Sequence, residues 1–278
     1  MSAPVNRYAV CLASVIATAV SSCAAPPREG ASPPLPEALA SLPAERLVDL
    51  SHPFDEETVF WPTARPFTLA IDAEGMTEGG YWYASNSLSM SEHGGTHLDA
   101  PYHFARDGWT ADRIPLGALL ARAVVIDVRK ACAHDPDHAT TKEEILGFEA
   151  VHGPIPAGAV AILWTGWGAR WPDRKRYLGD DTPGDASNLH FPGVSPEAAR
   201  YLAETRRVAG VGIDTASIDP GRSKDFLAHR VLAAANIYNL ENLRGVGRLP
   251  PAGATVIALP MKIAGGTGGP ARVVAILP

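Results

Sequence analysis

Three histidines and one aspartate lie within a single short segment, although the whole chain holds only 9 histidines. They are His93, His97, Asp99 and His103. His93 and His97 have the i, i+4 spacing of a metal-binding helix, but two glycines lie between them and Pro101 follows, which disfavours a helix. The pattern favours a tight loop that leads into a strand, where His97 and Asp99 point to the same side.

These residue types are suited to binding a metal ion. Two neutral imidazoles and one carboxylate are ligands that a borderline divalent ion, zinc or manganese, accepts while positions remain open for water. The two glycines allow the backbone to fold His93 onto the same point as His97 and Asp99. We therefore expect these three residues to hold a divalent ion, with His103 left free of it.

The elements that must position this segment are expected to be mainly strands. Short apolar runs predict strands in the middle of a sheet, and alternating runs predict half-buried strands. The alternating runs are Arg46–Ser51, Pro66–Asp72 and Tyr81–Met90, and the apolar runs are Ala121–Val128, Ala159–Trp164, Val208–Ile213, Thr255–Leu259 and Ala271–Leu277. Helices are expected at Thr141–Ala150 and Ser195–Thr205, the second with Pro196 in its first turn. No shift in composition after Pro43 marks a boundary, so we expect one α/β domain.

Composition excludes several classes of protein. The chain has 278 residues, with 24 Lys and Arg against 30 Asp and Glu, and a net charge of -6. Because no run of basic residues could neutralise phosphates, nucleic acid is not expected as a partner. The 3 cysteines lack CxxC spacing, which excludes a disulfide scaffold, a zinc knuckle and a thioredoxin-type site. Cys132 is expected to be a buried, inert thiol.

The first residues have the pattern of an export signal. Arg7 precedes the uncharged apolar run Tyr8–Val20, which is too short to span a bilayer and is typical of a signal peptide over residues 1–22. The run ends in small residues and Cys23, similar to the site at which bacterial lipoproteins are cleaved and acylated. We expect an exported protein, periplasmic or membrane-anchored as a lipoprotein, with residues 23–45 as an Ala- and Pro-rich linker. Ordinary cleavage and secretion, or an N-terminal helix kept in the fold, are the alternatives.

The segment from His93 to Phe104 resembles the HxGTHxDxPxHF motif of the metal-dependent cyclase family, which includes bacterial kynurenine formamidases and isatin hydrolases. The resemblance extends over residues 46–278. It includes Asp49–His52, Phe60–Pro62, Gly212–Asp219, Asn239–Leu243 and Leu259–Arg272. It implies a single α/β domain of the swivelling β/β/α, barrel-like type, and a homodimer or a larger homo-oligomer.

The resemblance also implies a set of metal ligands. It places a first ion on His93, His97 and Asp99. It places a second ion on His229 and Glu241, with the aspartate as the bridge. Since some relatives work with a single metal, one or two divalent ions, zinc or manganese, are expected.

Two further residues match positions with a role in the family. His103 matches the histidine that serves as proton donor and acceptor, and Trp61 matches a tryptophan that lines the substrate pocket. A metal ion can lower the pKa of its bound water to about 7 and polarise a carbonyl group, so no side-chain nucleophile is required. His103, with a near-neutral pKa, can take a proton from the water and return it to the leaving nitrogen.

The sequence therefore predicts a metal-dependent hydrolase that cleaves the C–N amide bond of an aryl-formamide or a cyclic amide. N-formylkynurenine and isatin are the two leading substrates. The export signal argues against the first, because kynurenine formamidases serve tryptophan breakdown in the cytoplasm. A lactone or ester hydrolase of the same family, and an exported protein that binds a small ligand through the metal without turnover, are the alternatives.

Other features of the sequence have ordinary explanations. Gly265–Gly269 looks like a phosphate-binding loop but lacks the Lys-Ser/Thr ending and a following helix, so a turn is expected. Asp214 and Asp219 either support the metal ligands from behind or stabilise turns.

Overall fold

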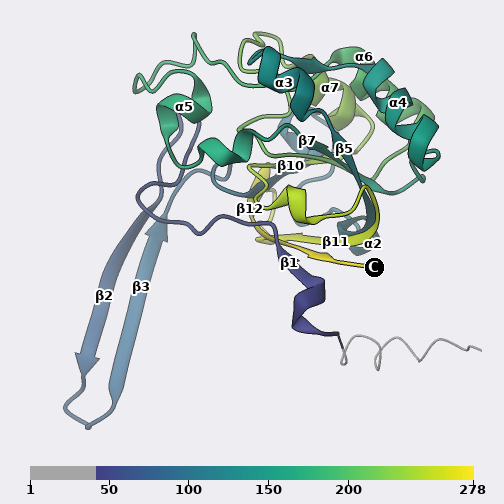
Figure 1. Ribbon diagram of the computed structural model, residues 1–278. Coiled ribbons are helices and arrows are strands. Elements are labelled where there is room, and N and C mark those ends of the chain that lie inside the picture. The colour runs from purple at the N-terminus through teal and green to yellow at the C-terminus, as the bar shows by residue number, and fades with distance from the viewer. Residues whose placement is uncertain (1–41) are drawn as a thin grey trace, which may run out of the picture. The chain divides into compact units, whose positions relative to one another are not determined.

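The computed structural model describes residues 42–278, and Figure 1 traces this part of the chain. The predicted signal peptide (1–22), Cys23 and the linker as far as residue 41 lie outside the described residues, so they stay predictions. Among residues 42–278, no helix is long and apolar enough to cross a membrane. The same residues form one compact unit.

A sheet of eight strands closes on itself to form a barrel. The strand order is β1-β12-β11-β5-β7-β9-β10-β4, and β4 also pairs with β12, so seven strands form the closed ring and β1 lies at its edge. The strands are β1 (Leu47–Asp49), β4 (His97–Asp99), β5 (Leu120–Asp127), β7 (Val160–Trp164), β9 (Gly210–Ile213), β10 (Tyr238–Glu241), β11 (Ala252–Pro260) and β12 (Gly268–Ile276). Strands β5, β7, β9 and β10 run parallel, and the other neighbours are antiparallel. The predicted α/β, barrel-like fold is confirmed.

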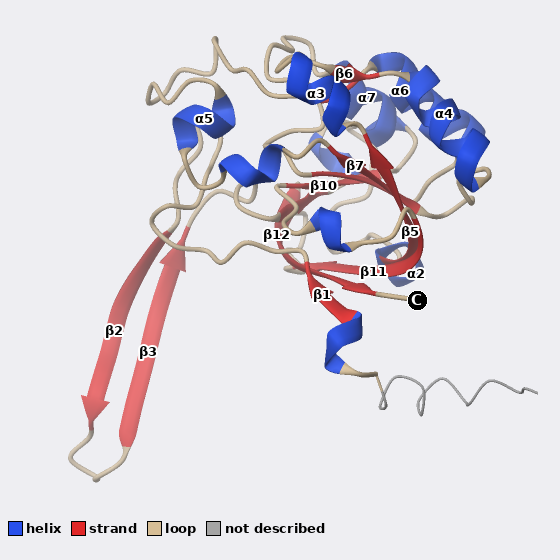
Figure 2. Cartoon of the chain, in the orientation of Figure 1, coloured by secondary structure: helices blue, strands red, loops and turns tan. Residues whose placement is uncertain are grey.

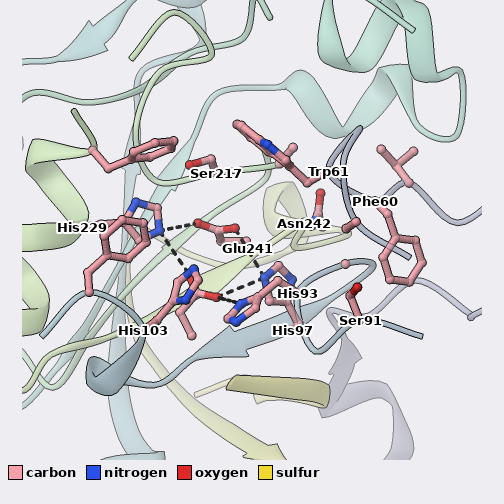
Figure 3. A pocket seen from close by; sticks show the side chains of 17 residues that line it. Phe60, Trp61, Ser91, His93, His97, His103, Ser217, His229, Glu241 and Asn242 are labelled. Carbon is pink, nitrogen blue, oxygen red and sulfur yellow. Dashed lines mark hydrogen bonds and ion pairs between the residues drawn. The ribbon is translucent and has the colours of Figure 1, made fainter. Parts of the chain in front are cut away.

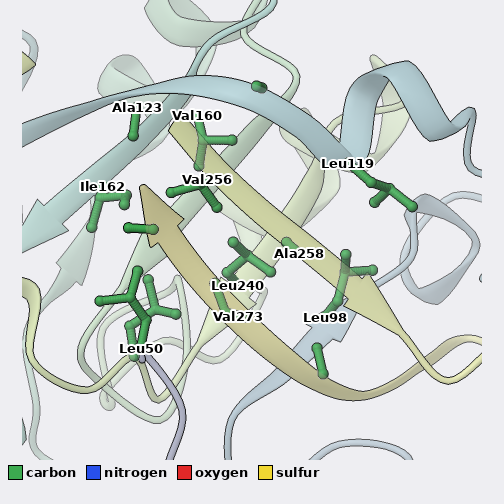
Figure 4. Close-up of a cluster of buried hydrophobic side chains, with 14 of the residues drawn as sticks. Leu50, Leu98, Leu119, Ala123, Val160, Ile162, Leu240, Val256, Ala258 and Val273 are labelled. Carbon is green, nitrogen blue, oxygen red and sulfur yellow. The ribbon is translucent and has the colours of Figure 1, made fainter. Parts of the chain in front are cut away.

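Apolar side chains fill the inside of the barrel (Figure 4). Along β12, Val273 and Ala275 are buried and point inwards, whereas Arg272 before them is exposed. Leu98, between the two site residues of β4, also belongs to this core. The strands predicted from the apolar runs Thr255–Leu259 and Ala271–Leu277 alternate in burial, because only one face of each lines the core of the barrel.

Helices cover the outer face of the parallel strands (Figure 2). They are α3 (Arg129–His134), α4 (Lys142–His152), α6 (Pro196–Arg200) and α7 (Leu227–Ala234), and the short helices α2 (Leu116–Leu119) and α5 (Arg174–Leu178) lie elsewhere. Strands β6 (Ala139–Thr140) and β8 (Gly193–Val194) pair with each other, and 3-10 turns lie at Ala44–Arg46, Pro101–His103, Trp167–Arg170 and Val246–Arg248. A second buried cluster, with Ile126, Ile145 and Leu232, fills the space between helices and strands. The parallel strands are apolar on both faces because both faces are covered.

Both predicted helices begin at the expected residues. Thr141 caps α4 in a capping box with Glu144, whose carboxylate accepts the backbone N–H of Thr141 at 2.7 Å. Ser195 caps α6 and Pro196 takes its first turn. The helix predicted over Ser195–Thr205 is α-helical only as far as Arg200 and continues as a π-helix over Tyr201–Arg206.

Strands β2 (Thr68–Met76) and β3 (Trp82–Ser89) form a hairpin that pairs with no other described strand. In Figure 1 this hairpin, which we call the arm, extends away from the barrel. Its large apolar side chains are each at least 51% exposed: Leu69, Ile71, Met76, Tyr81, Trp82, Tyr83 and Leu88. The predicted strands are present, but the expectation that they are half-buried is wrong, because no other part of the described chain covers them.

Candidate metal centre and active site

Two glycines bring His93 and His97 to the same place. Gly95 has a left-handed φ of 56°, and a Cβ added there would lie 2.6 Å from a phenylalanine ring. A Cβ added at Gly94 would overlap the ring of Phe60. Since neither position can hold a side chain, the loop between the two histidines folds tightly, as its sequence predicts.

The register of the sheet brings residues of β10 and β12 next to His97 and Asp99. Strand β4 carries His97 and Asp99 between β10 and β12, and Glu241 of β10 is the register partner of His97. Gly268 of β12 is the register partner of Asp99, and a Cβ there would lie 2.7 Å from Cε1 of His93. The pairing of β4 with strands from later in the sequence therefore assembles the cluster.

Asp99 lies at the centre of the cluster. One carboxylate oxygen is 2.6 Å from Nδ1 of His93 and 3.1 Å from Nε2 of His97. The other is 3.1 Å from Nε2 of His229, which is also 3.1 Å from Glu241 (Figure 3). The ligand atoms form two groups that share Asp99, one with His93 and His97 and one with His229 and Glu241. Within each group all ligand atoms lie within 4.8 Å of one another.

Burial and mutual charge set the ionisation of these groups. Burial would raise the pKa of Asp99, but the surrounding imidazoles hold that pKa well below its usual range. Burial and the charge of Asp99 raise the pKa of Glu241. Burial would lower the pKa of His97, whereas its hydrogen bond to Asp99 and the two carboxylates raise it to about 9. Two buried carboxylates among three imidazoles are a donor set that a divalent cation stabilises, so these residues fit a metal ion.

Hydrogen bonds at Nδ1, the ring nitrogen that points away from the cluster, orient the imidazoles of His97 and His229. Nδ1 of His97 donates to the carbonyl of Gly95 at 3.0 Å, and Nδ1 of His229 lies 2.7 Å from Asp219. Asp219 also accepts two backbone N–H groups in the first turn of α7, each at 3.0 Å. These contacts direct Nε2 of both histidines into the cluster. Of the two roles left open for Asp219, the structure thus shows support of a histidine.

Other residues singled out in the sequence have structural contacts. Asp214 accepts the backbone N–H and the hydroxyl of Thr165 at 2.8 and 2.6 Å, so it stabilises the turn after β7. Cys132 is buried, and burial raises the pKa of its thiol to about 12. Gly265 lies in a turn, as expected, but Thr267 after it lies 2.8 Å from Nε2 of His93. The glycine-rich segment therefore also supports the cluster, which its sequence did not indicate.

His103 lies beside the cluster at the end of its own 3-10 turn. Its ring stacks on His93 with centroids 3.8 Å apart, and it lies 6.2 Å from the ring of His229. The residue as a whole is exposed, yet desolvation on the side of the ring that packs against the cluster lowers the pKa of His103 to about 4. That pKa lies below the near-neutral value expected from the sequence. His103 is therefore a neutral imidazole at pH 7, able to accept a proton.

A cavity of about 350 Å³ opens onto the cluster and is lined by aromatic rings on its other side (Figure 3). The ring of Phe226 lies 6.2 Å from that of Trp61 and 5.4 Å from that of Phe104. The remaining lining residues are Val59, Phe60, Ala64, Ser91, Gly94, Ala216, Ser217 and Asn242, with the cluster residues and His103. A flat aromatic molecule fits such walls while its polar group faces the cluster.

Sequence reasoning found one of these aromatic residues and missed two. Trp61 lines the cavity, where the resemblance places it. Phe104 closes the histidine segment, so its position next to His103 was an available signal. Phe226 has a left-handed φ of 51°, which is rare for a bulky residue, and no local pattern indicates it.

Comparison with protein families places this site in a known group. The family model described as "Putative cyclase" matches residues 48–220, which is more than half of the chain. The chain belongs to the cyclase family. The matched residues include the histidine segment from His93 to His103 and end before His229 and Glu241.

The relatives of this cyclase-family chain include isatin hydrolases and kynurenine formamidases. It is 36% identical over 208 residues to an isatin hydrolase from Roseibium aggregatum, covering 72% of this chain and 77% of that one. It is 31% identical to a kynurenine formamidase from Salinibacter ruber, covering 82% and 96%. The solved structure of isatin hydrolase A from Ralstonia solanacearum has 32% identity and a TM-score of 0.80, covering 90% and 99%. The predicted family is confirmed, and so is the predicted enzyme class, a hydrolase of a non-peptide C–N bond.

Proposed function

We propose that this cyclase-family protein is a metal-dependent hydrolase that opens the amide ring of an isatin-like substrate. The observation that carries the proposal is the cavity in which three imidazoles and two carboxylates face an aromatic wall. Isatin is a flat aromatic ring fused to a cyclic amide, so its ring matches the wall while its amide carbonyl faces the cluster. The isatin hydrolases among the relatives and the predicted export both favour isatin over N-formylkynurenine.

The cluster residues are proposed to hold two ions of zinc or manganese that share Asp99. His93 and His97 complete the first set of ligands, and His229 and Glu241 complete the second. Two groups of ligand atoms that meet at one carboxylate support this count. Imidazole and carboxylate donors suit both metals. A divalent ion bound there supplies a Lewis acid that polarises the amide carbonyl and lowers the pKa of a water molecule.

The remaining chemistry falls to residues around the cluster. Hydrolysis adds the oxygen of water to the carbonyl carbon, breaks the C–N bond and places a proton on the nitrogen. His103, a neutral imidazole stacked on His93, accepts the proton from the attacking water and delivers it to the leaving nitrogen. Trp61 and Phe226 hold the aromatic ring of the substrate and exclude water from that side.

Metal-dependent turnover tests the proposal. The purified protein is stripped of metal with a chelator and reloaded with zinc or manganese, and the absorbance of isatin, N-formylkynurenine and an aryl lactone is followed in parallel. Isatin loss that requires metal is expected. His97→Ala should abolish it, whereas His152→Ala, which removes an exposed histidine at the end of α4, should not.

Other results would redirect the proposal. Consumption of the lactone alone would make the protein a lactone hydrolase. Bound metal with none of the three substrates consumed would favour a protein that binds its ligand without turnover.

The proposed location is outside the cytoplasm, with residues 1–22 removed as a signal peptide, a lipid on Cys23 and residues 23–45 as a linker. The sequence pattern alone supports it. Cells fed an alkyne-tagged fatty acid should label the wild-type chain in the membrane fraction but not the Cys23→Ser variant. An unlabelled wild-type chain in the periplasm would indicate ordinary secretion instead.

The proposed assembly is a homodimer in which the arms mediate contact between the two copies. A two-stranded hairpin is marginally stable alone in water, and a large exposed apolar patch marks an interaction site. The register places five of these side chains on one face of the arm: Leu69, Ile71, Met76, Trp82 and Leu88. At ~100 Å² each they would bury ~500 Å², so two arms reach ~1,000 Å², the lower end of the range for specific interfaces. A second copy therefore supplies enough area to cover the arm.

The mass in solution tests this assembly. Light scattering should give twice the mass of one chain for the wild type, and a single chain for the double variant Ile71→Ser with Trp82→Ser. Leu146→Ser, which changes an exposed apolar residue of α4, is the matched control and should leave the dimer intact. A wild-type protein of single-chain mass would overturn the proposal.

A further inference from the structure

Asn242 joins the end of β10 to the loop that precedes His97. It follows Glu241, lines the cavity and is 2% exposed. Its φ of 54° is left-handed, which asparagine tolerates better than most residues. Its backbone N–H donates to the carbonyl of Thr215 at 2.8 Å, and its carbonyl accepts the hydroxyl of Thr96 at 2.8 Å. The backbone of this residue is thus fixed on both sides.

The side chain of Asn242 holds the carbonyl group that orients His97. Its Nδ2 donates to the oxygen of Gly95 at 2.7 Å, and Nδ1 of His97 donates to the same oxygen at 3.0 Å. Both lone pairs of that oxygen are therefore used. Nε2 of His97 then faces Asp99 at 3.1 Å and Glu241 at 3.5 Å.

The carbonyl of Gly95 sets the direction of this amide, and Tyr177 is the partner of its oxygen. Because a carbonyl oxygen can only accept, Nδ2 of Asn242 faces Gly95 and Oδ1 faces the hydroxyl of Tyr177, 3.0 Å away. The hydroxyl also lies 3.1 Å from the carbonyl of Asp214, so its single proton is shared between two acceptors. Tyr177 is fully buried, and burial raises the pKa of its hydroxyl well above the usual value, so it remains a donor.

We propose that Asn242, held by Tyr177, is a positioning residue for the metal site. It fixes the carbonyl of Gly95, keeps a proton on Nδ1 of His97 and leaves Nε2 to face the metal. The left-handed Gly95 has no side chain of its own to anchor that carbonyl, so the amide of Asn242 is its anchor. The amide of Asn242 is bonded to Gly95 and Tyr177, and Tyr177 does not line the cavity. The inference rests on the proposed role of His97 as a metal ligand.

Three variants change this contact in graded ways. Asn242→Gly keeps the left-handed backbone and removes the amide, and Asn242→Asp keeps the shape but sets a carboxylate oxygen against the carbonyl of Gly95. Both should weaken metal binding about 10- to 100-fold, the usual effect of losing a group that orients a ligand. Tyr177→Phe leaves the amide bonded to Gly95 and removes only the partner of its oxygen, so its effect should be smaller. Competition with a chelator of known affinity measures the metal Kd.

Asn236→Gly is the matched control. Asn236 is also left-handed, with φ of 56°, but its side chain accepts the N–H of Trp109 at 2.9 Å and it does not line the cavity. Its metal Kd should equal that of the wild type. An equal loss of affinity in Asn236→Gly and Asn242→Gly would indicate general destabilisation and overturn the proposal. Wild-type affinity in both Asn242 variants would overturn it as well.

A second readout needs no metal. In the metal-free protein, the Nδ1 proton of His97 should exchange slowly with water, as measured by NMR with ¹⁵N-labelled histidine and assigned by its absence in His97→Gln. Exchange should be about tenfold faster in Asn242→Gly, because one hydrogen bond to the shared carbonyl is lost. If the wild type binds no metal, the proposed function fails, and this exchange still decides the positioning role. Unchanged exchange in Asn242→Gly would exclude it.

Discussion

The metal cluster buries charged side chains, whereas the arm exposes apolar ones. In the cluster, charged groups are buried, and Asp99 is 3% exposed among three imidazoles. On the arm, apolar groups are exposed, with Ile71 at 65% and Trp82 at 60%. Buried charge is costly unless it is paired, and exposed apolar area costs about 25 cal/mol per Å². The first region offsets its cost within one chain, whereas the second would offset its cost through the proposed association of two copies.

Asp99→Asn should break the cluster and spare the arm. The amide keeps the shape but removes the charge that both ligand groups share, so metal binding and turnover should be lost. Elemental analysis checks the metal, and light scattering should still give the mass of the dimer. One retained equivalent of metal would mean that the two ligand groups work separately.

His103→Ala should separate proton transfer from metal binding. Loss of the imidazole should lower kcat by about 10²- to 10⁴-fold, the usual contribution of a general acid or base, while the metal content stays unchanged. Steady-state kinetics on metal-loaded protein measure this. Tyr102→Ala, an exposed neighbour in the same turn, is the control and should keep wild-type kcat. Metal lost together with activity would place His103 among the ligands.

Metal affinity should rise with pH, while the association of the arms should not change. The carboxylates raise the pKa of His97 to about 9, so at neutral pH its imidazole is protonated in the metal-free protein, and the metal must displace that proton. The carboxylates around His229 raise its pKa as well, against the effect of its burial. As the pH rises toward the pKa of His97, the apparent Kd should therefore fall by about tenfold per pH unit for each protonated imidazole that the metal displaces. Calorimetry in buffers of different ionisation enthalpy counts the released protons. An affinity that is the same at pH 6 and pH 8 would contradict the expected protonation.

Trp61→Leu should have the smallest effect. Aromatic contacts contribute about 0.5–1.5 kcal/mol, so KM for an aromatic substrate should rise about 2- to 10-fold with little change in kcat. Trp82→Leu on the arm is the comparison, and its KM should stay that of the wild type. A higher KM in Trp82→Leu would show that the arm of one copy reaches the cavity of the other, and would end the division between the two regions.

The histidine segment could be predicted because its signals are local. The two glycines before His97, the spacing to Asp99 and Pro101 together fix a loop that enters a strand. The geometry agrees, with Nε2 of His97 3.1 Å from Asp99. The signals for the starts of α4 and α6 are also local, because each capping residue lies directly before its helix. Chemistry carried by neighbours in sequence is therefore accessible without a structure.

His229 and Glu241 entered only through the resemblance, because their positions depend on distant contacts. Helix α7 has no capping side chain at its start, where Phe226 adopts a left-handed backbone. Asp219 accepts the free N–H groups of its first turn instead, from earlier in the chain. The fully buried β10 has no alternation to indicate a strand. Alternation did predict the arm, but a period of two cannot show whether anything covers its faces.

The closure of the barrel also sets the order in which the centre can form. Strand β4 is flanked by β10 and β12, which are encoded well after it. During synthesis, β4 with His97 and Asp99 therefore remains unpaired until β10 and β12 have been made. Strand pairing between residues far apart in sequence is slow. On a nascent chain that has not yet reached Gly268, β4 lacks its partner β12, so the sheet that holds the ligands is incomplete. Under the proposed export, a chain that crosses the membrane before it folds would take its ions from the compartment outside, and the metal available there would decide which ion the site holds.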